Sequence, residues 1–326
     1  MIITLPNIDG KIWNLEQHVI DIVHCVINKQ PFQISLNDEG PDATKLGLYS
    51  LLDTLCDRYK FPKNQITIIT CNQLELHPEY KVQKRAPLYI ESAQQFAKQN
   101  QFPSKTFKQE FKHFGLFVGR SNWLRLWLAS YLHNRYNNKT ALTFHYNPTS
   151  DHSQDHLGLD DLIRFRPDLV QDLNPLQLIK DCPVIYQAVE GYPILTPAHF
   201  NISKIYNKFF LEVVCETYCQ GASFYPTEKI WRPIINRTPF IVQGPVNYID
   251  NLHRIGFKTF SRWFDESHSQ DDYSYQPVEI CATLDKIAGY SVIELEAMYI
   301  DMQDTLEHNY QVMMSMTKRK ITEIFR

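Results

Sequence analysis

Residues 224–233 read FYPTEKIWRP, and residues 234–245 continue as IINRTPFIVQGP. Apolar side chains recur here at helical spacing directly after Thr227, which predicts a helix with Thr227 as its N-cap. A short apolar stretch follows and predicts a buried strand. Together with the apolar stretch upstream, the order of strand, helix and strand is the one expected in an α/β fold.

The charges at the start of this predicted helix need a further explanation. Lys229 lies in the first turn, where the helix dipole disfavours a cation unless an anion lies beside it. A pyrophosphate would satisfy both Lys229 and the free N–H groups of the helix start. Glu228 would then accept hydrogen bonds from ribose hydroxyls. The alternative is an ordinary helix start, in which Thr227 and Glu228 cap the helix and Lys229 is solvated.

Strand-like and helix-like stretches alternate along the chain in two series. The first series predicts strands at 31–37 and 65–72 with a helix between them. Its strands are almost wholly apolar, as in parallel sheets that are covered on both faces. The second series predicts strands at 113–119, 140–147, 208–216 and 239–244, and helices at 122–135, from 227, and at 246–256.

Two polar segments interrupt this pattern. Residues 97–112 are lysine-rich and are interpreted as a linker. Residues 148–162 are rich in His and Asp but lack the ligand spacing of a calcium or zinc site, so a mobile surface loop is favoured. We therefore predict two facing Rossmann-like domains, at 1–105 and 106–290, with a C-terminal helix at 291–326 that packs across them.

The composition indicates a soluble globular protein. The 326 residues are 44% hydrophobic, with a formal net charge of -3 and seven cysteines without a framework spacing, which are expected to be reduced core thiols. The sequence opens without a secretory signal pattern and has no apolar run of membrane-spanning length, so a cytoplasmic location is expected. The near-neutral charge does not favour nucleic acid as a partner, although a local basic groove would permit it.

The central stretch resembles the donor-site segment of the family-10 α-1,3-fucosyltransferases, which carry Tyr-x-Thr-Glu-Lys before a helix. Tyr225, Thr227, Glu228 and Lys229 match this pattern position by position. The resemblance implies that these four residues bind a nucleotide-diphosphate sugar, with a GDP-sugar favoured and fucose as one candidate sugar. It also implies a GT-B-like architecture, with the donor bound by the C-terminal domain.

The resemblance extends over roughly residues 111–265. In FFLEVVCETY, Glu216 matches the Glu of a Phe-Glu-Asn strand end in these enzymes, although the residues on either side of it differ. In FGLFVGRSNWLRLWLASYL, Arg125 is the nearest match to an arginine that binds the donor pyrophosphate, and Arg120 stands at the strand end. A surface arginine is the alternative for Arg120. The N-terminal half carries no motif of the family.

Deprotonation of an acceptor hydroxyl, from a glycan or another molecule, requires a base, which we expect in the N-terminal domain. Asp38 and Glu39 follow the strand 31–37 directly and are the predicted catalytic residues. The alternative is that both acids only cap the next helix. Glu75, after the strand 65–72, is the second candidate for the base.

The resemblance and the charge pattern together predict an inverting glycosyltransferase that needs no metal and no cofactor. No convincing Asp-x-Asp pattern follows a predicted strand, so Arg125 and Lys229 would stabilise the leaving diphosphate in place of a metal. Two other functions stay open. One is a non-catalytic module that binds nucleotides or polyanions, and the other is a DNA-modifying glycosyltransferase with a basic groove wide enough for a duplex.

Overall fold

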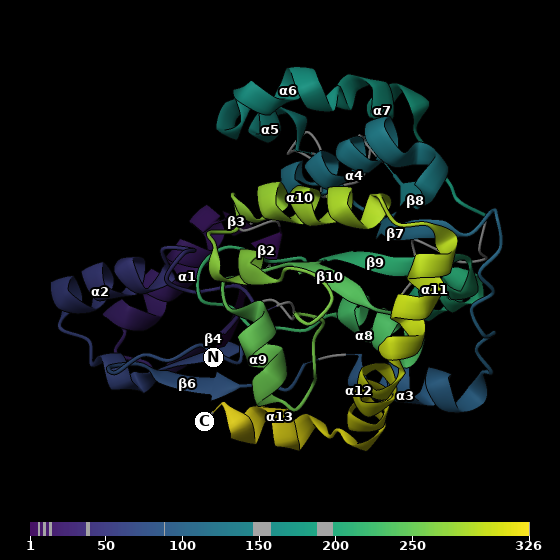
Figure 1. The fold of residues 1–326 in the computed structure, drawn as a ribbon. Coiled ribbons are helices and arrows are strands. Elements are labelled where there is room, and N and C mark those ends of the chain that lie inside the picture. Colours follow the sequence, from purple (N-terminus) through teal and green to yellow (C-terminus); the bar gives the residue numbers. More distant parts are fainter. Residues whose placement is uncertain are drawn as a thin grey trace.

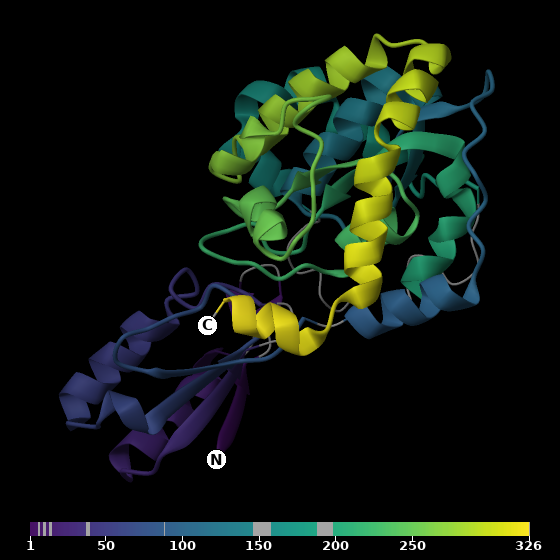
Figure 2. The same cartoon turned by 60° about the horizontal axis from the view of Figure 1, so that its bottom comes forward.

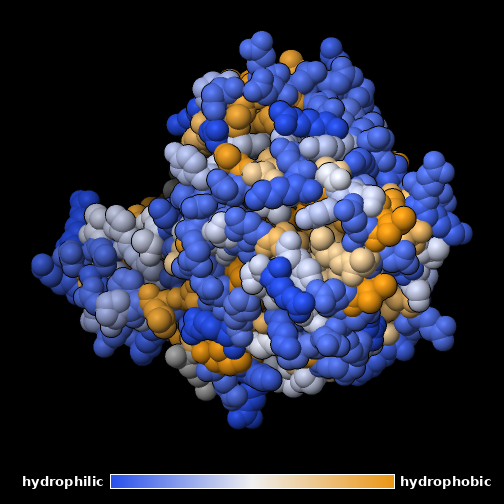
Figure 3. All heavy atoms as spheres, viewed as in Figure 1, coloured by the Kyte–Doolittle hydropathy of each residue, from blue (hydrophilic) through white to orange (hydrophobic). Residues whose placement is uncertain are grey.

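The computed structural model describes residues 1–5, 7–8, 11–12, 15–36, 40–87, 89–145, 158–187 and 198–325. Among these residues the chain is an α/β fold with two separate four-stranded parallel sheets and one short antiparallel pair, β2 (Asn7–Ile8) with β3 (Lys11–Ile12). Figures 1 and 2 show the first sheet with its helices as a smaller lobe beside a larger one. The face in Figure 3 is mainly hydrophilic, with scattered hydrophobic residues, as is usual for a protein surface.

The first sheet has the strand order β1-β4-β5-β6, with all neighbouring strands parallel. Its apolar side chains, such as Ile34 and its partner Ile68, are fully buried, because helices cover the sheet. The strands are β1 (Ile2–Leu5), β4 (Phe32–Leu36), β5 (Ile66–Thr70) and β6 (Lys81–Lys84), and the helices of this lobe are α1 (Leu15–Ile27) and α2 (Leu48–Tyr59).

The second sheet has the order β10-β9-β7-β8, again parallel throughout. The chain passes from β7 to β8 on one side and then returns to β9 and β10 on the other side. The strand order therefore reverses between β7 and β9, which is the place where open α/β sheets bind ligands. The strands are β7 (Lys112–Val118), β8 (Thr140–Phe144), β9 (Phe209–Cys215) and β10 (Phe240–Gln243).

Helices surround the second sheet and join its core (Figure 1). The described helices of this lobe are α3 (Ile90–Gln99), α4 (Trp123–Tyr136), α5 (Leu159–Phe165), α6 (Pro167–Leu173), α7 (Pro175–Asp181), α8 (Glu228–Ile235), α9 (Tyr248–Arg254), α10 (Gln276–Ala288), α11 (Val292–Asp301), α12 (Gln303–Ser315) and α13 (Lys318–Ile324). Short 3-10 turns lie at Lys63–Gln65, Asn137–Lys139, Ala198–Lys208 and Ser267–Gln270.

The apolar core is divided between the lobes. One buried cluster extends from Ile3 to Tyr80, and the large cluster around the second sheet begins at Ile90. Helix α3 therefore packs with the second sheet, through Ile90, Ala93 and Ala97. The predicted domain boundary at residue 105 stays a prediction.

The described parts of the two polar segments contain regular structure at their ends that the sequence did not indicate. Helix α3 extends to Gln99 and β7 begins at Lys112, so only residues 100–111 are irregular. Lys105 within them donates to the carbonyl oxygens of Tyr206 and Phe209, at 2.7 and 2.5 Å, and holds this segment against the lobe. The loop predicted at 148–162 is corrected in its last part, because Leu159 begins helix α5; residues 148–157 lie outside the described residues.

A short segment after β9 joins the two lobes. Asn72, just past the end of β5, accepts a hydrogen bond from the N–H of Phe224 at 3.0 Å and donates from its amide to the Ala222 carbonyl at 2.9 Å. The Ala222 N–H donates to Asp42 at 2.7 Å, and the Gln73 N–H donates to the Phe224 carbonyl at 3.0 Å. The segment 222–224 thus lies against the carboxyl edge of the first sheet.

The C-terminal helices contact both lobes. Lys84 of β6 donates to the carbonyl of Phe325 at 2.6 Å, and the ring of Phe325 packs against Phe224. Gln94 of α3 donates to the carbonyls of Met313 and Met316. The predicted helical tail is present as α11, α12 and α13, and Figure 2 shows α13 passing beside the smaller lobe.

Candidate functional site

A pocket of about 280 Å³ lies at the carboxyl ends of β7 and β9, where the strand order of the second sheet reverses. One wall is the turn into helix α4, and the opposite wall is the segment that follows β9. Helix α5 and the loop before α10 close the other sides. The lining residues are Ser121, Asn122, Trp123, Leu124, Gly158, Asp161, Arg164, Phe165, Thr217, Tyr218, Cys219, Gln220 and Tyr273.

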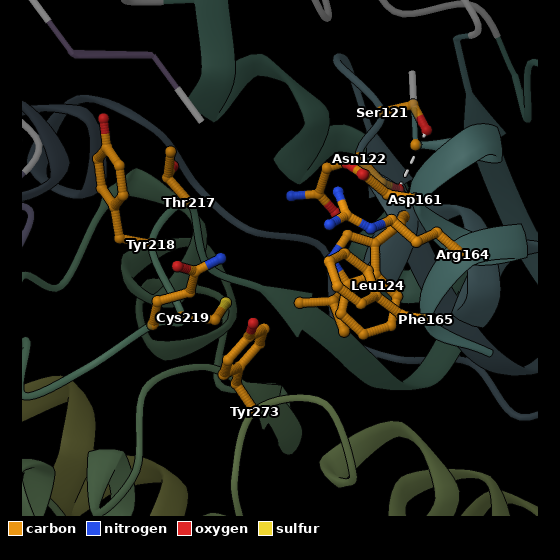
Figure 4. Close-up of a pocket in the computed structure, with 13 residues that line it drawn as sticks. Ser121, Asn122, Leu124, Asp161, Arg164, Phe165, Thr217, Tyr218, Cys219 and Tyr273 are labelled. Atoms are coloured by element: carbon orange, nitrogen blue, oxygen red, sulfur yellow. Dashed lines mark hydrogen bonds between the residues drawn. The ribbon is translucent and has the colours of Figure 1, made fainter. Parts of the chain in front are cut away.

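Figure 4 shows how the side chains lie around this pocket. Asn122, Arg164 and Phe165 lie on one side of the open space, and Thr217 and Cys219 lie on the other. Asn122 is also the N-cap of α4, because its side chain accepts the N–H of Arg125 at 3.0 Å. The start of a helix and the ends of two strands therefore meet at one cavity, which combines polar and aromatic walls.

The side chain of Arg125 lies behind the pocket and forms hydrogen bonds with both of its main walls. Its side chain is 4% exposed, and its guanidinium donates to the carbonyl oxygens of Arg120, Cys215 and Glu216, at 2.9, 3.3 and 3.0 Å. These carbonyls belong to the turn after β7 and to the end of β9. Arg125 was predicted to bind the donor; it lies one layer behind the pocket and positions the segments that line it.

Glu216 holds the start of helix α8. Its buried carboxylate accepts hydrogen bonds from the backbone N–H and the hydroxyl of Thr227, at 3.2 and 2.6 Å, and from the Tyr248 hydroxyl at 2.5 Å. Burial raises the pKa of Glu216, and the charge of Lys229 and these hydrogen bonds oppose that rise. The carboxyl group of Glu216 therefore lies at the N-terminus of α8, where the charge pattern predicted a pyrophosphate.

Lys229 connects the predicted motif to the pocket wall. Its ammonium group forms an ion pair with Glu228 at 2.8 Å and donates to the hydroxyl of Thr217 at 3.2 Å. Thr217 lines the pocket. The predicted N-cap is confirmed, since the Thr227 hydroxyl accepts the N–H of Lys229. The Lys229 side chain is 18% exposed, so its charge acts beside the cavity with little solvent around it.

Tyr225 of the motif lies where the two lobes contact each other. A Cβ atom added to Gly40 would lie 2.8 Å from the Tyr225 Cβ and 2.9 Å from the Asn72 nitrogen. The Ser223 hydroxyl donates to the Gly40 carbonyl at 2.6 Å. Asp38 and Glu39, the predicted catalytic acids, lie outside the described residues, and Gly40 directly follows them.

Glu75, the second candidate for the base, is a buried acceptor in the smaller lobe. It accepts hydrogen bonds from the Ala43 N–H at 3.1 Å, the Tyr49 hydroxyl at 3.0 Å and the Asn72 amide at 3.3 Å. Burial raises the pKa of Glu75 and these hydrogen bonds oppose the rise. Through Asn72, this carboxylate supports the contact with segment 222–224.

Several other predictions concern cysteines, metals and membranes. All seven cysteines are free and six are buried, and burial raises the pKa of Cys215 and of Cys219 to about 12, as expected of core thiols. In the part of the chain that the structure describes, no group of three or more His, Cys, Asp or Glu side chains is arranged to hold a metal ion. Among the same residues, none of the helices has both the length and the apolar character that crossing a bilayer requires.

The sequence analysis missed most of the side chains that line the pocket. Asp161 lies in the last part of the segment interpreted as a loop, Arg164 and Phe165 follow that segment within α5, and Tyr273 comes from a segment that had no assigned element. Only Asn122 had a recognisable signal, as a capping residue between a strand and a helix. Side chains from three distant segments converge here, which no single stretch of sequence indicates.

No family model matches the chain, and no curated protein matches it. One solved structure that is similar to the chain is described as "Crystal Structure of alpha1,3-Fucosyltransferase". The comparison covers 94% of this chain and 90% of that chain, at 12% sequence identity and a TM-score of 0.26. A TM-score of this size carries no argument about fold or function.

Proposed function

We propose that the chain is an inverting, metal-independent glycosyltransferase that binds a nucleotide-diphosphate sugar in the pocket between Asn122 and Thr217. The observation that carries the proposal is the location of this pocket. It lies at the reversal of strand order in a parallel sheet, and Lys229, from the stretch that resembles fucosyltransferases, donates to its wall at Thr217.

Positive charge near the pocket supports binding of a diphosphate. Lys229 lies beside one wall, where its ammonium group donates to the hydroxyl of Thr217. Arg125 adds a positive charge behind the cavity, where its described hydrogen-bond partners are neutral carbonyl groups. Fixed cations of this kind stabilise the charge that develops on a leaving diphosphate without reorganising during the reaction.

The reaction would be a single displacement. The acceptor oxygen attacks the anomeric carbon of the sugar, the bond from that carbon to the phosphate oxygen breaks, and the nucleoside diphosphate leaves. A base takes the acceptor proton. We assign the base to Asp38 or Glu39, because the residue after them, Gly40, lies against Tyr225 and the segment that continues into the donor pocket. Two facing domains with the boundary near residue 105, as in a GT-B-like enzyme, are part of this proposal.

Calorimetry tests donor binding directly. We expect a nucleoside diphosphate to bind to the wild-type protein, with GDP preferred over UDP, and Lys229→Ala to weaken binding by about 1.5–3 kcal/mol, the range for charge-assisted hydrogen bonds. Lys286→Ala is the control, because Lys286 is an exposed lysine of helix α10 and its replacement makes the same change of charge. Unchanged affinity in Lys229→Ala contradicts the assignment of the site.

Activity separates the proposed enzyme from the two other candidate functions. Release of sugar from a GDP-sugar or UDP-sugar, to water or to a glycan acceptor, is expected of a glycosyltransferase. Nucleotide binding without any turnover would identify a non-catalytic binding module. A duplex DNA that binds in a strongly salt-dependent manner and accepts the sugar would identify a DNA-modifying enzyme.

A further inference from the structure

The side of the pocket formed by helix α5 differs in character from the side near Lys229. Phe165 packs on Trp123 with ring centroids 5.4 Å apart, yet it stays 48% exposed. The guanidinium of Arg164 lies 5.4 Å from the centroid of the Phe165 ring, and Tyr273 approaches Trp123 edge-on. A large aromatic ring that lines a cavity and remains half exposed offers a flat apolar surface to a planar ligand.

Two charged groups lie at the same side. Asp161 and Arg164 are three residues apart on α5, so they lie on one face of the helix, and both line the pocket. Among the described residues, neither side chain forms an ion pair with a carboxylate or a cation, and Asp161 accepts no hydrogen bond. A carboxylate that only accepts and a guanidinium that only donates are therefore available at the edge of the aromatic surface.

We propose that Asp161, Arg164 and Phe165 form the nucleoside subsite of the pocket, in which Phe165 stacks on the base and the two charged side chains bind its edge. This inference rests on the proposed function. It orients the donor, with the base at α5 and the phosphates towards Thr217 and Lys229. The volume of about 280 Å³ suits a nucleoside better than a complete nucleotide sugar, which leaves the sugar outside this cavity, towards the smaller lobe.

The chemistry of the two charged groups selects the base. Guanine presents two adjacent N–H donors, at N1 and the 2-amino group, and two adjacent acceptors, at O6 and N7. A carboxylate takes the donor pair and an arginine takes the acceptor pair, each in a bidentate manner. Adenine and uracil lack both of these pairs, and cytosine lacks the donor pair. Hypoxanthine, the base of IDP, keeps the acceptors and loses only the 2-amino group, so comparison of GDP with IDP isolates the role of Asp161.

The experiment measures the affinities of the full-length protein for GDP, IDP and inorganic pyrophosphate by calorimetry. For Phe165→Ala we expect about 10-fold weaker GDP binding, from the loss of base stacking. For Asp161→Asn and Arg164→Gln we expect about 10- to 100-fold weaker GDP binding, from the loss of charge-assisted hydrogen bonds. Asp161→Asn should also bind GDP and IDP equally, whereas the wild-type protein prefers GDP. Pyrophosphate should still bind to Phe165→Ala and Asp161→Asn.

Ile163→Ala is the matched control, because Ile163 is an exposed residue of the same helix and does not line the pocket. Its GDP affinity should equal that of the wild-type protein, and the melting temperatures of all variants report whether each one folds. If the wild-type protein binds GDP and the GDP affinity is unchanged in both Asp161→Asn and Phe165→Ala, the proposed subsite is overturned but the proposed function is not. Equal losses of GDP and pyrophosphate would also overturn the subsite. A wild-type protein that binds none of the nucleotides would overturn both the subsite and the proposed function.

Discussion

The side chain of Asn72 accepts a hydrogen bond from the N–H of Phe224 at 3.0 Å, although the two residues lie 152 positions apart. Asn72 follows the last strand residue of β5 by two positions, and Phe224 belongs to the segment that leads from the pocket wall to helix α8. The contact therefore joins the carboxyl edge of the first sheet to the candidate donor site of the second.

Replacement of Asn72 by alanine should weaken this contact between the two lobes. The variant loses the hydrogen bonds of the Asn72 side chain with the Phe224 N–H, the Ala222 carbonyl, the Leu74 N–H and Glu75, and we expect about 1–3 kcal/mol lower stability, because the Phe224 N–H is left buried without its partner. Hydrogen exchange should be faster at the Phe224 amide and unchanged in strand β9. Asn28→Ala is the control, since Asn28 is exposed and bonds only to its own helix at His24. Unchanged protection at Phe224 would show that Asn72 does not hold the segment.

Replacement of two glycines of the smaller lobe by alanine compares two effects on stability. At one position the change adds only backbone strain, and at the other it also adds a clash between the lobes. Gly40 and Gly47 have φ of +67° and +73°, so alanine costs about 1–2 kcal/mol at either position. Only at Gly40 would the added Cβ also clash, with Tyr225 and with Asn72. Chemical denaturation should therefore show a clearly larger loss of stability for Gly40→Ala than for Gly47→Ala. Equal losses would mean that the two lobes adjust to the added methyl group without cost.

Arg125 and Lys229 should behave differently when each is replaced by alanine. Arg125 is buried and satisfies three backbone carbonyls, so Arg125→Ala should lower the stability by about 3 kcal/mol and weaken nucleotide binding indirectly. Lys229 pairs with the buried Glu228 and contacts the pocket wall at Thr217, so its replacement should weaken nucleotide binding more strongly than it lowers the melting temperature. The paired measurement is calorimetric affinity and thermal unfolding of both variants. A stable Arg125→Ala protein with wild-type affinity would contradict its positioning role.

Six strands and several helices of this fold were predictable because their signals are local, whereas strands β1 and β6 were not predicted. The apolar stretches at β4, β5, β7, β8, β9 and β10 all form strands, and the cap at Thr227 forms as expected. Helix α5 was missed because it follows a long polar segment and has only seven residues, too few to show a clear period. The role of Arg125 was not predictable either, since its partners are backbone carbonyls, which carry no sequence signal.

Glu75 provides a prediction about pH. Burial raises the pKa of its carboxyl group in the folded protein above the ordinary value of 4.5, so the folded state binds this proton more tightly than the unfolded state does. The contribution of Glu75 to stability is therefore greatest at low pH and falls as the pH rises from 4.5 through the raised folded pKa. Glu75→Gln should lack this fall, so the stability difference between wild type and variant should change across that window. A difference that is constant with pH would contradict the raised pKa.

The identity of the base is the last prediction. The sequence places Asp38 and Glu39 directly after a strand, and Gly40, which follows them, contacts the other lobe at Tyr225. A general base contributes about 10²- to 10⁴-fold to turnover, so Glu39→Gln should lower the rate of sugar transfer by that factor while GDP affinity stays near that of the wild type. Asp38→Asn tests the neighbouring acid in the same assay. Glu75 already accepts three hydrogen bonds within its own lobe, so Glu75→Gln should affect stability more than turnover. If transfer survives in Glu39→Gln and Asp38→Asn but is lost in a folded Glu75→Gln variant, the base is Glu75, and the assignment of Asp38 or Glu39 is wrong.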